Sequence, residues 1–287
     1  MLRRHAITAL LSTAFPLRAQ KSLTDLIPDA HAAALLVDVP TRRLLAVHGA
    51  SLAAAALLPP GSTMKPFALA ALLESGKLRP DDAFHCPGQL MVGDRPVVCA
   101  HAPLGEPLRV RTALAYSCNC FVANAAVRFQ PGELALALAR IGMASRTGWF
   151  GETEAAGQVP RAESKAATQL QAIGEAGVLI TPAELALAYR HLALTSARRG
   201  MEAILAGLED AVEFGTAQRA KVAGLTVAGK TGSIHAADGA AIAWFAGFAP
   251  SRSPAVAITV MLQARSGGTD AAPIAGRILE AHLKGRL

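Results

Sequence analysis

The stretch Ser62-Thr63-Met64-Lys65 combines a hydroxyl and an amine at the start of an apolar run that continues to Glu74. A Pro-Pro-Gly sequence precedes it, so we predict a helix over 62–74. A spacing of three residues places the side chains of Ser62 and Lys65 on one face of that helix, whose N-terminus favours an oxyanion. A lysine desolvated beside another cation has a lowered pKa and can act as a base toward the serine hydroxyl.

A second hydroxyl lies in Ser117-Cys118-Asn119, directly before a run over 121–129 that we predict to be helical. Its serine can relay a proton between Lys65 and a leaving amine, and its amide can hold a substrate backbone. Taken alone, both short motifs are close to chance, and a Ser-x-Asn sequence more often forms a cap or a turn.

Lys230-Thr231-Gly232-Ser233 is a less common sequence, and it lies within a predicted strand over 225–234. The glycines at 229 and 232 allow another backbone to approach this strand closely. An extended peptide can pair with such an edge while Lys230 and Thr231 meet its terminal carboxylate.

The order of predicted elements indicates one folded unit in two lobes. Apolar runs over 33–39 and 43–48 read as an antiparallel hairpin, and strands are predicted again over 225–234, 241–248 and 255–262. The clearest helix between them starts at Thr181, where Pro182 and Glu184 complete a capping box, and it runs to near Gly200. A last amphipathic helix is predicted over about 271–283. We therefore expect a sheet lobe (32–49 and 225–287) and a helical lobe (50–224).

Five segments of the chain resemble class B penicillin-binding proteins: residues 60–66, 113–119, 173–182, 228–233 and 243–250. The resemblance covers roughly residues 32–284. It implies an α+β fold of the β-lactamase/transpeptidase type, with a five-stranded antiparallel sheet flanked by helices. It also implies an all-helical lobe, and an active site between the lobes.

The resemblance assigns roles to residues of the three motifs. Ser62 would be the acylated nucleophile, Lys65 its base and Ser117 a helper in proton transfer. The residues implied to bind substrate are Asn119, Lys230, Thr231, Gly232 and Ser233. The backbone amides of Ser62 and Ser233 would form the oxyanion hole.

The implied activity is that of a serine DD-transpeptidase acting on the D-Ala-D-Ala end of peptidoglycan stem peptides, with β-lactams as inhibitors. No metal or organic cofactor is expected. A DD-carboxypeptidase is the nearest alternative, and a class D-like serine β-lactamase or a non-catalytic β-lactam-binding module are others. Glu152 and Glu154 are the candidates for a deacylating carboxylate, but both are expected to be surface residues.

Residues 1–19 resemble an export signal, with Arg3 and Arg4 before an apolar stretch, and residues 20–31 are expected to be a short linker. We therefore expect an exported monomer in the periplasm or at the outer face of the cytoplasmic membrane, with cell-wall synthesis proteins as possible partners. The net charge is +7, but aromatic residues make up only 5% and no basic stripe is interleaved with them. This argues against binding to nucleic acid.

Four cysteines complete the set of candidate residues. Cys86 and Cys99 flank a turn-rich segment, so in an oxidising compartment they are candidates for a disulfide. Cys118 and Cys120 read as buried small side chains. Because there is no Cys-x-x-Cys or His-x-x-x-His sequence, the spacing argues against zinc.

Overall fold

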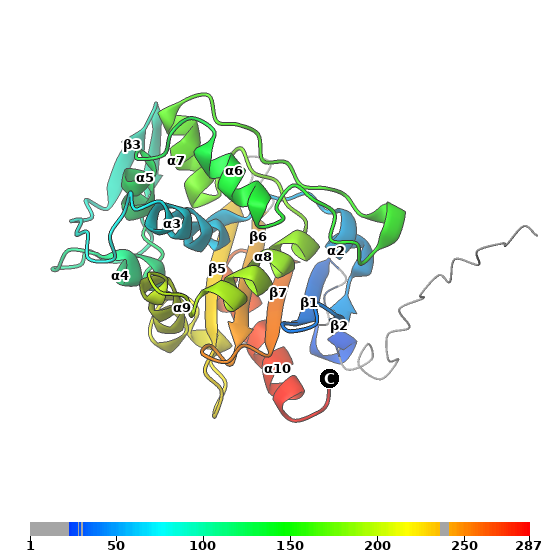
Figure 1. Cartoon of the computed structure of the whole chain (residues 1–287). Coiled ribbons are helices and arrows are strands. Elements are labelled where there is room, and N and C mark those ends of the chain that lie inside the picture. The colour runs from blue at the N-terminus through cyan, green and yellow to red at the C-terminus, as the bar shows by residue number, and fades with distance from the viewer. Residues whose placement is uncertain (1–22, 28, 30, 236–240) are drawn as a thin grey trace, which may run out of the picture.

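The computed structural model describes residues 23–235, apart from 28 and 30, and residues 241–287 (Figure 1). The expected export signal lies outside these residues. The elements are β1 (Ala32–Asp38), β2 (Leu44–His48), α2 (Ala50–Ala55), η1 (Gly61–Met64), α3 (Lys65–Glu74), β3 (Gln89–Val92), β4 (Arg95–Val98), α4 (Val110–Ala115), α5 (Asn119–Ala126), α6 (Glu133–Arg140), η2 (Gly151–Thr153), α7 (Lys165–Ile173), α8 (Pro182–Thr195), α9 (Glu202–Glu213), η3 (Gln218–Ala220), β5 (Ala228–His235), β6 (Ala241–Ala249), β7 (Val256–Gln263), η4 (Gly267–Ala271) and α10 (Ala272–Leu283).

The predicted five-stranded antiparallel sheet is confirmed, and its strand order is β2-β1-β7-β6-β5. The N-terminal hairpin joins the C-terminal strands through β1 and β7, where Ala32 pairs with Leu262 and Asp38 with Val256. This pairing leaves β5, the strand that carries Lys230 and Thr231, at one edge of the sheet.

Helices cover both faces of the sheet because its strands are apolar on both sides. Along β7, Ala257 and Met261 belong to the core shared with α8, whereas Ile258 and Val260 belong to the core shared with α10. Figure 1 shows α8 crossing the front of the sheet, while α3 to α7 gather beside it. The core on the α8 side therefore continues from the sheet into the helical region.

The predicted capping box of α8 is present. Thr181 accepts a hydrogen bond from the amide of Glu184 at 3.1 Å, and the Glu184 carboxylate accepts one from the amide of Thr181 at 2.9 Å. The helix ends at Thr195, earlier than expected, where the Thr195 and Ser196 hydroxyls bond to carbonyls of the preceding turn. Such back-bonding competes with continuation of a helix.

The helix predicted over 62–74 has two parts. Its first turn is the 3-10 segment η1, and α3 begins only at Lys65. The amide of Gly61 donates to Gly174 O at 3.0 Å, so a contact distant in sequence shapes this turn. Pro66 lies in the first turn of α3, where its missing N–H costs no helical hydrogen bond.

Residues 23–26, inside the expected linker, form a helical turn, and Leu23 and Ile27 are buried in the core on the α10 side. In the turn-rich segment between Cys86 and Cys99, β3 and β4 form an antiparallel hairpin. Within the described part of the chain, no helix has the length and apolar character that crossing a bilayer requires.

Candidate active site

A cleft of about 720 Å³ lies where the sheet edge meets the helical region. Residues of all three sequence motifs line it: Ser62, Ser117, Asn119, Thr231, Gly232 and Ser233. Ser62 comes from η1, Ser117 and Asn119 from the turn before α5 and its first residue, and the others from β5. Segments far apart along the chain therefore share one cavity wall.

Lys65 connects the first motif to the second. It is fully buried, and its Nζ donates to Ser117 O at 2.6 Å, to Ser117 Oγ at 3.1 Å and to Asn119 Oδ1. Its backbone amide donates to Ser62 O, so Ser62 and Lys65 are related by one 3-10 turn. Residues three apart in a 3-10 turn point the same way, so the serine and lysine share a side of η1.

Burial lowers the pKa of Lys65 to about 8, although nearby thiol groups and Glu175 act in the opposite direction. Burial also lowers the pKa of Lys230 well below its usual range, and the charge of Lys65 adds to this effect. Both lysines lie behind the cleft wall instead of lining it. Two buried cations near each other favour a neutral amine at this site.

The second motif has a strained backbone. Ser117 has a φ of 57°, a left-handed value that is uncommon for a residue other than glycine. Asn119 follows at the start of α5, and its Nδ2 donates to Val98 O at 2.7 Å. This amide has a second hydrogen for use elsewhere. The hydrogen bonds from Lys65 to this motif, and from Asn119 to the β3–β4 hairpin, hold the motif in its turn conformation.

The third motif lies on β5, where a threonine missed by sequence reasoning completes it. Thr216 Oγ1 accepts from Thr231 Oγ1 at 3.0 Å and from Lys230 Nζ at 3.4 Å. Ser233 Oγ accepts from the amide of Gly267 at 3.0 Å, and both segments border the cleft wall. No local pattern marks Thr216, which reaches the site from the turn after α9.

Aromatic and basic residues outside the motifs also line the cleft. Tyr116 and Phe214 form a tilted pair with ring centroids 5.9 Å apart, and His101, Arg219 and His235 line the same cleft. Of these, only Tyr116 had a sequence signal, since it directly precedes the second motif.

The two glutamates considered as deacylating groups do not line this cleft. Glu152 is exposed, as expected. The prediction for Glu154 was wrong, because it is 1% exposed and its carboxylate accepts from the amides of Thr147 and Gly148, both at 2.7 Å. These hydrogen bonds close the loop over residues 147–154. The local sequence does not indicate them.

Cys86 and Cys99 lie at the two ends of the β3–β4 hairpin as free thiols, with their Sγ atoms 3.6 Å apart. The disulfide between them stays a prediction. Cys118 and Cys120 are buried, as expected.

Comparison with known proteins agrees with this architecture. The family model described as "Penicillin binding protein transpeptidase domain" matches residues 32–280. The fold is similar to Pseudomonas aeruginosa PBP2, with a TM-score of 0.82 and 19% identity over 94% of this chain and 74% of that one. It is also similar to the transpeptidase domain of Burkholderia pseudomallei penicillin-binding protein 3, with a TM-score of 0.84 and 20% identity over 94% and 95% of the two chains. A structure described as a peptidoglycan glycosyltransferase from Burkholderia ambifaria matches with a TM-score of 0.84 and 21% identity, over 94% and 96%. Because the family model spans nearly all of the described residues, the chain belongs to the penicillin-binding protein transpeptidase domain family.

Proposed function

We propose that this protein is a serine DD-transpeptidase that acts on the D-Ala-D-Ala end of peptidoglycan stem peptides through an acyl-enzyme on Ser62. The observation that supports this most directly is the buried Lys65, which contacts Ser117 and Asn119 beside a cleft that Ser62 lines. A lysine with its pKa lowered to about 8 is a usable proton acceptor near neutral pH.

In the proposed reaction, Ser62 Oγ attacks the carbonyl carbon of the penultimate D-Ala and gives its proton to Lys65. The tetrahedral intermediate collapses, the C–N bond breaks, and the terminal D-Ala leaves after its amine takes a proton through Ser117. An acceptor amine then attacks the Ser62 ester and forms a new peptide bond, which restores the serine hydroxyl. Slow attack by water at this step distinguishes a transpeptidase from a hydrolase.

Substrate binding follows from the position of β5 at the sheet edge. An extended peptide that pairs with this edge brings its scissile carbonyl toward Ser62. Its terminal carboxylate would be met by Thr231, with the buried amine of Lys230 behind it. The amides of Ser62 and Ser233 are the proposed oxyanion donors, and a Cβ built on Gly61 would lie 3.4 Å from the Ser233 nitrogen, so the two segments adjoin.

The first test is covalent labelling with a fluorescent penicillin. We expect the wild type to be labelled and to keep its label for many minutes, and Ser62→Ala to remain unlabelled while it keeps its fold by circular dichroism. A wild type that takes no label contradicts the proposal. Release of the label within seconds indicates a β-lactamase instead.

The second test separates transfer from hydrolysis. A stem pentapeptide is incubated with and without an acceptor amine, and the products are separated by mass. A cross-linked product that depends on the acceptor and on Ser62 supports the transpeptidase. Tetrapeptide alone in both samples indicates a DD-carboxypeptidase.

Work on peptidoglycan requires a location outside the cytoplasmic membrane, and we propose that residues 1–19 direct export. Fusion of these residues to a reporter that is active only after export tests this directly. A fusion that remains inactive, beside an active fusion with an established export signal, contradicts it.

A further inference from the structure

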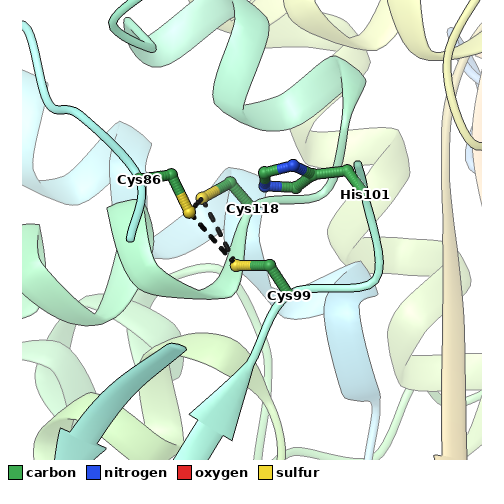
Figure 2. Close-up of side chains that lie close together, drawn as sticks. All are labelled: Cys86, Cys99, His101 and Cys118. Atoms are coloured by element: carbon green, nitrogen blue, oxygen red, sulfur yellow. Dashed lines mark hydrogen bonds between the residues drawn. The ribbon is translucent and has the colours of Figure 1, made fainter. Parts of the chain in front are cut away.

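Three cysteines and one histidine from separate segments converge beside the second motif (Figure 2). Cys86 precedes β3, Cys99 and His101 follow β4, and Cys118 caps α5. The three Sγ atoms form a nearly regular triangle, with separations of 3.6 Å between Cys86 and Cys99, 3.6 Å between Cys99 and Cys118, and 3.5 Å between Cys86 and Cys118. One ligand atom from each of the four residues lies within 4.8 Å of all the others.

We propose that Cys86, Cys99, Cys118 and His101 bind one Zn²⁺ ion in a tetrahedral Cys₃His site. Zinc holds thiolate sulfurs at about 2.3 Å, which places them about 3.8 Å apart around a tetrahedral ion. The observed separations are close to this value, so the sulfurs need to move only slightly to accept the ion. A set of soft thiolates with one imidazole selects zinc over the hard cations calcium and magnesium.

The hydrogen bonding of His101 suits it to bind a metal ion. Its Nδ1 lies 2.8 Å from Ala102 O, and since a carbonyl can only accept, Nδ1 carries the proton. Nε2 then has a free lone pair, and it is buried with no hydrogen-bond partner among the residues that the structure describes. Figure 2 shows the ring turned toward the sulfur of Cys118. Metal-bound histidines commonly hold their second nitrogen against a backbone carbonyl in this way.

Backbone amides mark the same three sulfurs as acceptors. Gly88 N donates to Cys86 Sγ at 3.4 Å, Cys120 N to Cys99 Sγ at 3.4 Å, and Phe121 N to Cys118 Sγ at 3.3 Å. These three hydrogen bonds hold the sulfurs in fixed positions beside one another.

Cys120 differs from these three cysteines. Its sulfur lies 3.4 Å from Cys99 Sγ and donates to Val97 O, and it is not one of the four mutually close ligand groups. The sequence shows no zinc-binding motif, because the four proposed ligands come from separate segments, namely the two ends of a hairpin and a helix cap. Only the fold brings them together.

Zinc here would fix the end of the β3–β4 hairpin to the turn that carries Ser117 and Asn119. Asn119 already donates to Val98 O, the residue before Cys99, so the ion would reinforce an existing contact. The ion would thus help to position the second motif. His101, which also lines the cleft, would connect the zinc site to the cleft.

The test begins with the full chain purified without chelators and with a phosphine reductant, and its metal content measured by mass spectrometry. We expect about one zinc per chain in the wild type. Cys86→Ser and His101→Ala should lose the zinc. Cys120→Ser is the matched control and should retain it, because it removes a neighbouring sulfur that is not a ligand.

In the wild type, cobalt gives a spectroscopic readout that does not depend on activity. Exchange of the ion for Co²⁺ in the wild type should give the visible bands of a tetrahedral site with thiolate charge transfer. Cys120→Ser should keep this spectrum, and Cys86→Ser, if it still binds Co²⁺, should lose about one third of the charge-transfer intensity.

Several results would overturn the assignment. A wild type without zinc that also fails to bind Co²⁺ under reducing conditions rejects the site. An intact mass two hydrogens lower without reductant, with Cys86 and Cys99 joined in one peptide fragment, indicates a disulfide instead. Loss of zinc from Cys120→Ser with retention in His101→Ala would mean that the ligands are four cysteines.

Discussion

Lys65 and Lys230 are buried completely behind the cleft, where a charged amine is costly. Lys65 has three oxygen acceptors around its Nζ, whereas Lys230 has Thr216 Oγ1 and Thr231 O at 3.3–3.4 Å. The pKa of Lys65 falls to about 8 and that of Lys230 falls well below its usual range, in both cases mainly through burial. A proposed base and a second buried amine thus lie behind the wall of the same cleft.

The rate of Ser62 acylation by penicillin should rise with pH up to about 8 and level off above it. Only the neutral amine of Lys65 accepts a proton, and its pKa is lowered to about 8, so each unit of pH below that value removes about tenfold of the base. Stopped-flow labelling between pH 6 and 9, with circular dichroism at each pH as a control for folding, measures this profile. A flat profile would exclude Lys65 as the base.

Glu184 stabilises several loops through one buried carboxylate. It accepts from the amides of Thr181 at 2.9 Å, Ser145 at 3.0 Å and Gly157 at 2.8 Å. In Glu184→Gln an amide group that can only donate replaces one acceptor oxygen, so we expect a loss of about 2–4 kcal/mol in the free energy of unfolding. Urea denaturation measures this loss. The exposed Glu152→Gln is the control, with a change within about 0.5 kcal/mol.

At the scale of elements, η1, β5 and η4 approach one another backbone to backbone. A Cβ on Gly232 would lie 2.8 Å from Pro60 O, and one on Gly267 would lie 2.5 Å from Gly232 O. Trp244 of β6 adds a hydrogen bond from its indole nitrogen to Pro59 O at 3.1 Å. The absence of a side chain at Gly232 therefore allows β5 to lie this close to the segment that carries Ser62.

Gly232→Ala should lower the rate of acylation by up to about 100-fold, because a shift of β5 away from η1 misplaces the reacting groups. The added methyl group meets the backbone oxygen of Pro60, which cannot rotate aside. Gly105→Ala is the matched control, since a Cβ there meets nothing within 4 Å and the backbone φ is ordinary. Penicillin labelling rates for both variants measure the effect. Equal rates would show that the close approach is not needed.

Elements defined by local chemistry were predicted well from sequence. The start of α8 depends on Thr181 and Glu184, three residues apart, and the structure has this capping box. The 3-10 turn of η1 was not predicted, because it depends on hydrogen bonds from Gly61 N to Gly174 O and from Tyr189 Oη to Thr63 O. Such contacts between distant segments have no signature in a local pattern.

At the scale of the whole molecule, the difference between local sequence patterns and contacts between distant segments explains which parts of the site were predicted. The serine and lysine motifs carry their chemistry in three or four adjacent residues, and so they were found. Thr216 joins the third motif only through the packing of α9 against β5, and the cysteine cluster depends on a hairpin closing over a helix cap. Their positions follow from tertiary structure alone.

The continuity of the core predicts that sheet and helical region unfold together. Val37 of β1 and Met261 of β7 belong to the same buried cluster as Leu69 of α3 and Phe121 of α5, so neither region keeps its core without the other. The chain has two tryptophans, and in Trp149→Phe the remaining Trp244 reports on the buried centre of β6. We expect its fluorescence and the helical circular dichroism signal to give coincident urea transitions. A fluorescence transition separated from the dichroism transition would instead assign the two lobes separate stabilities.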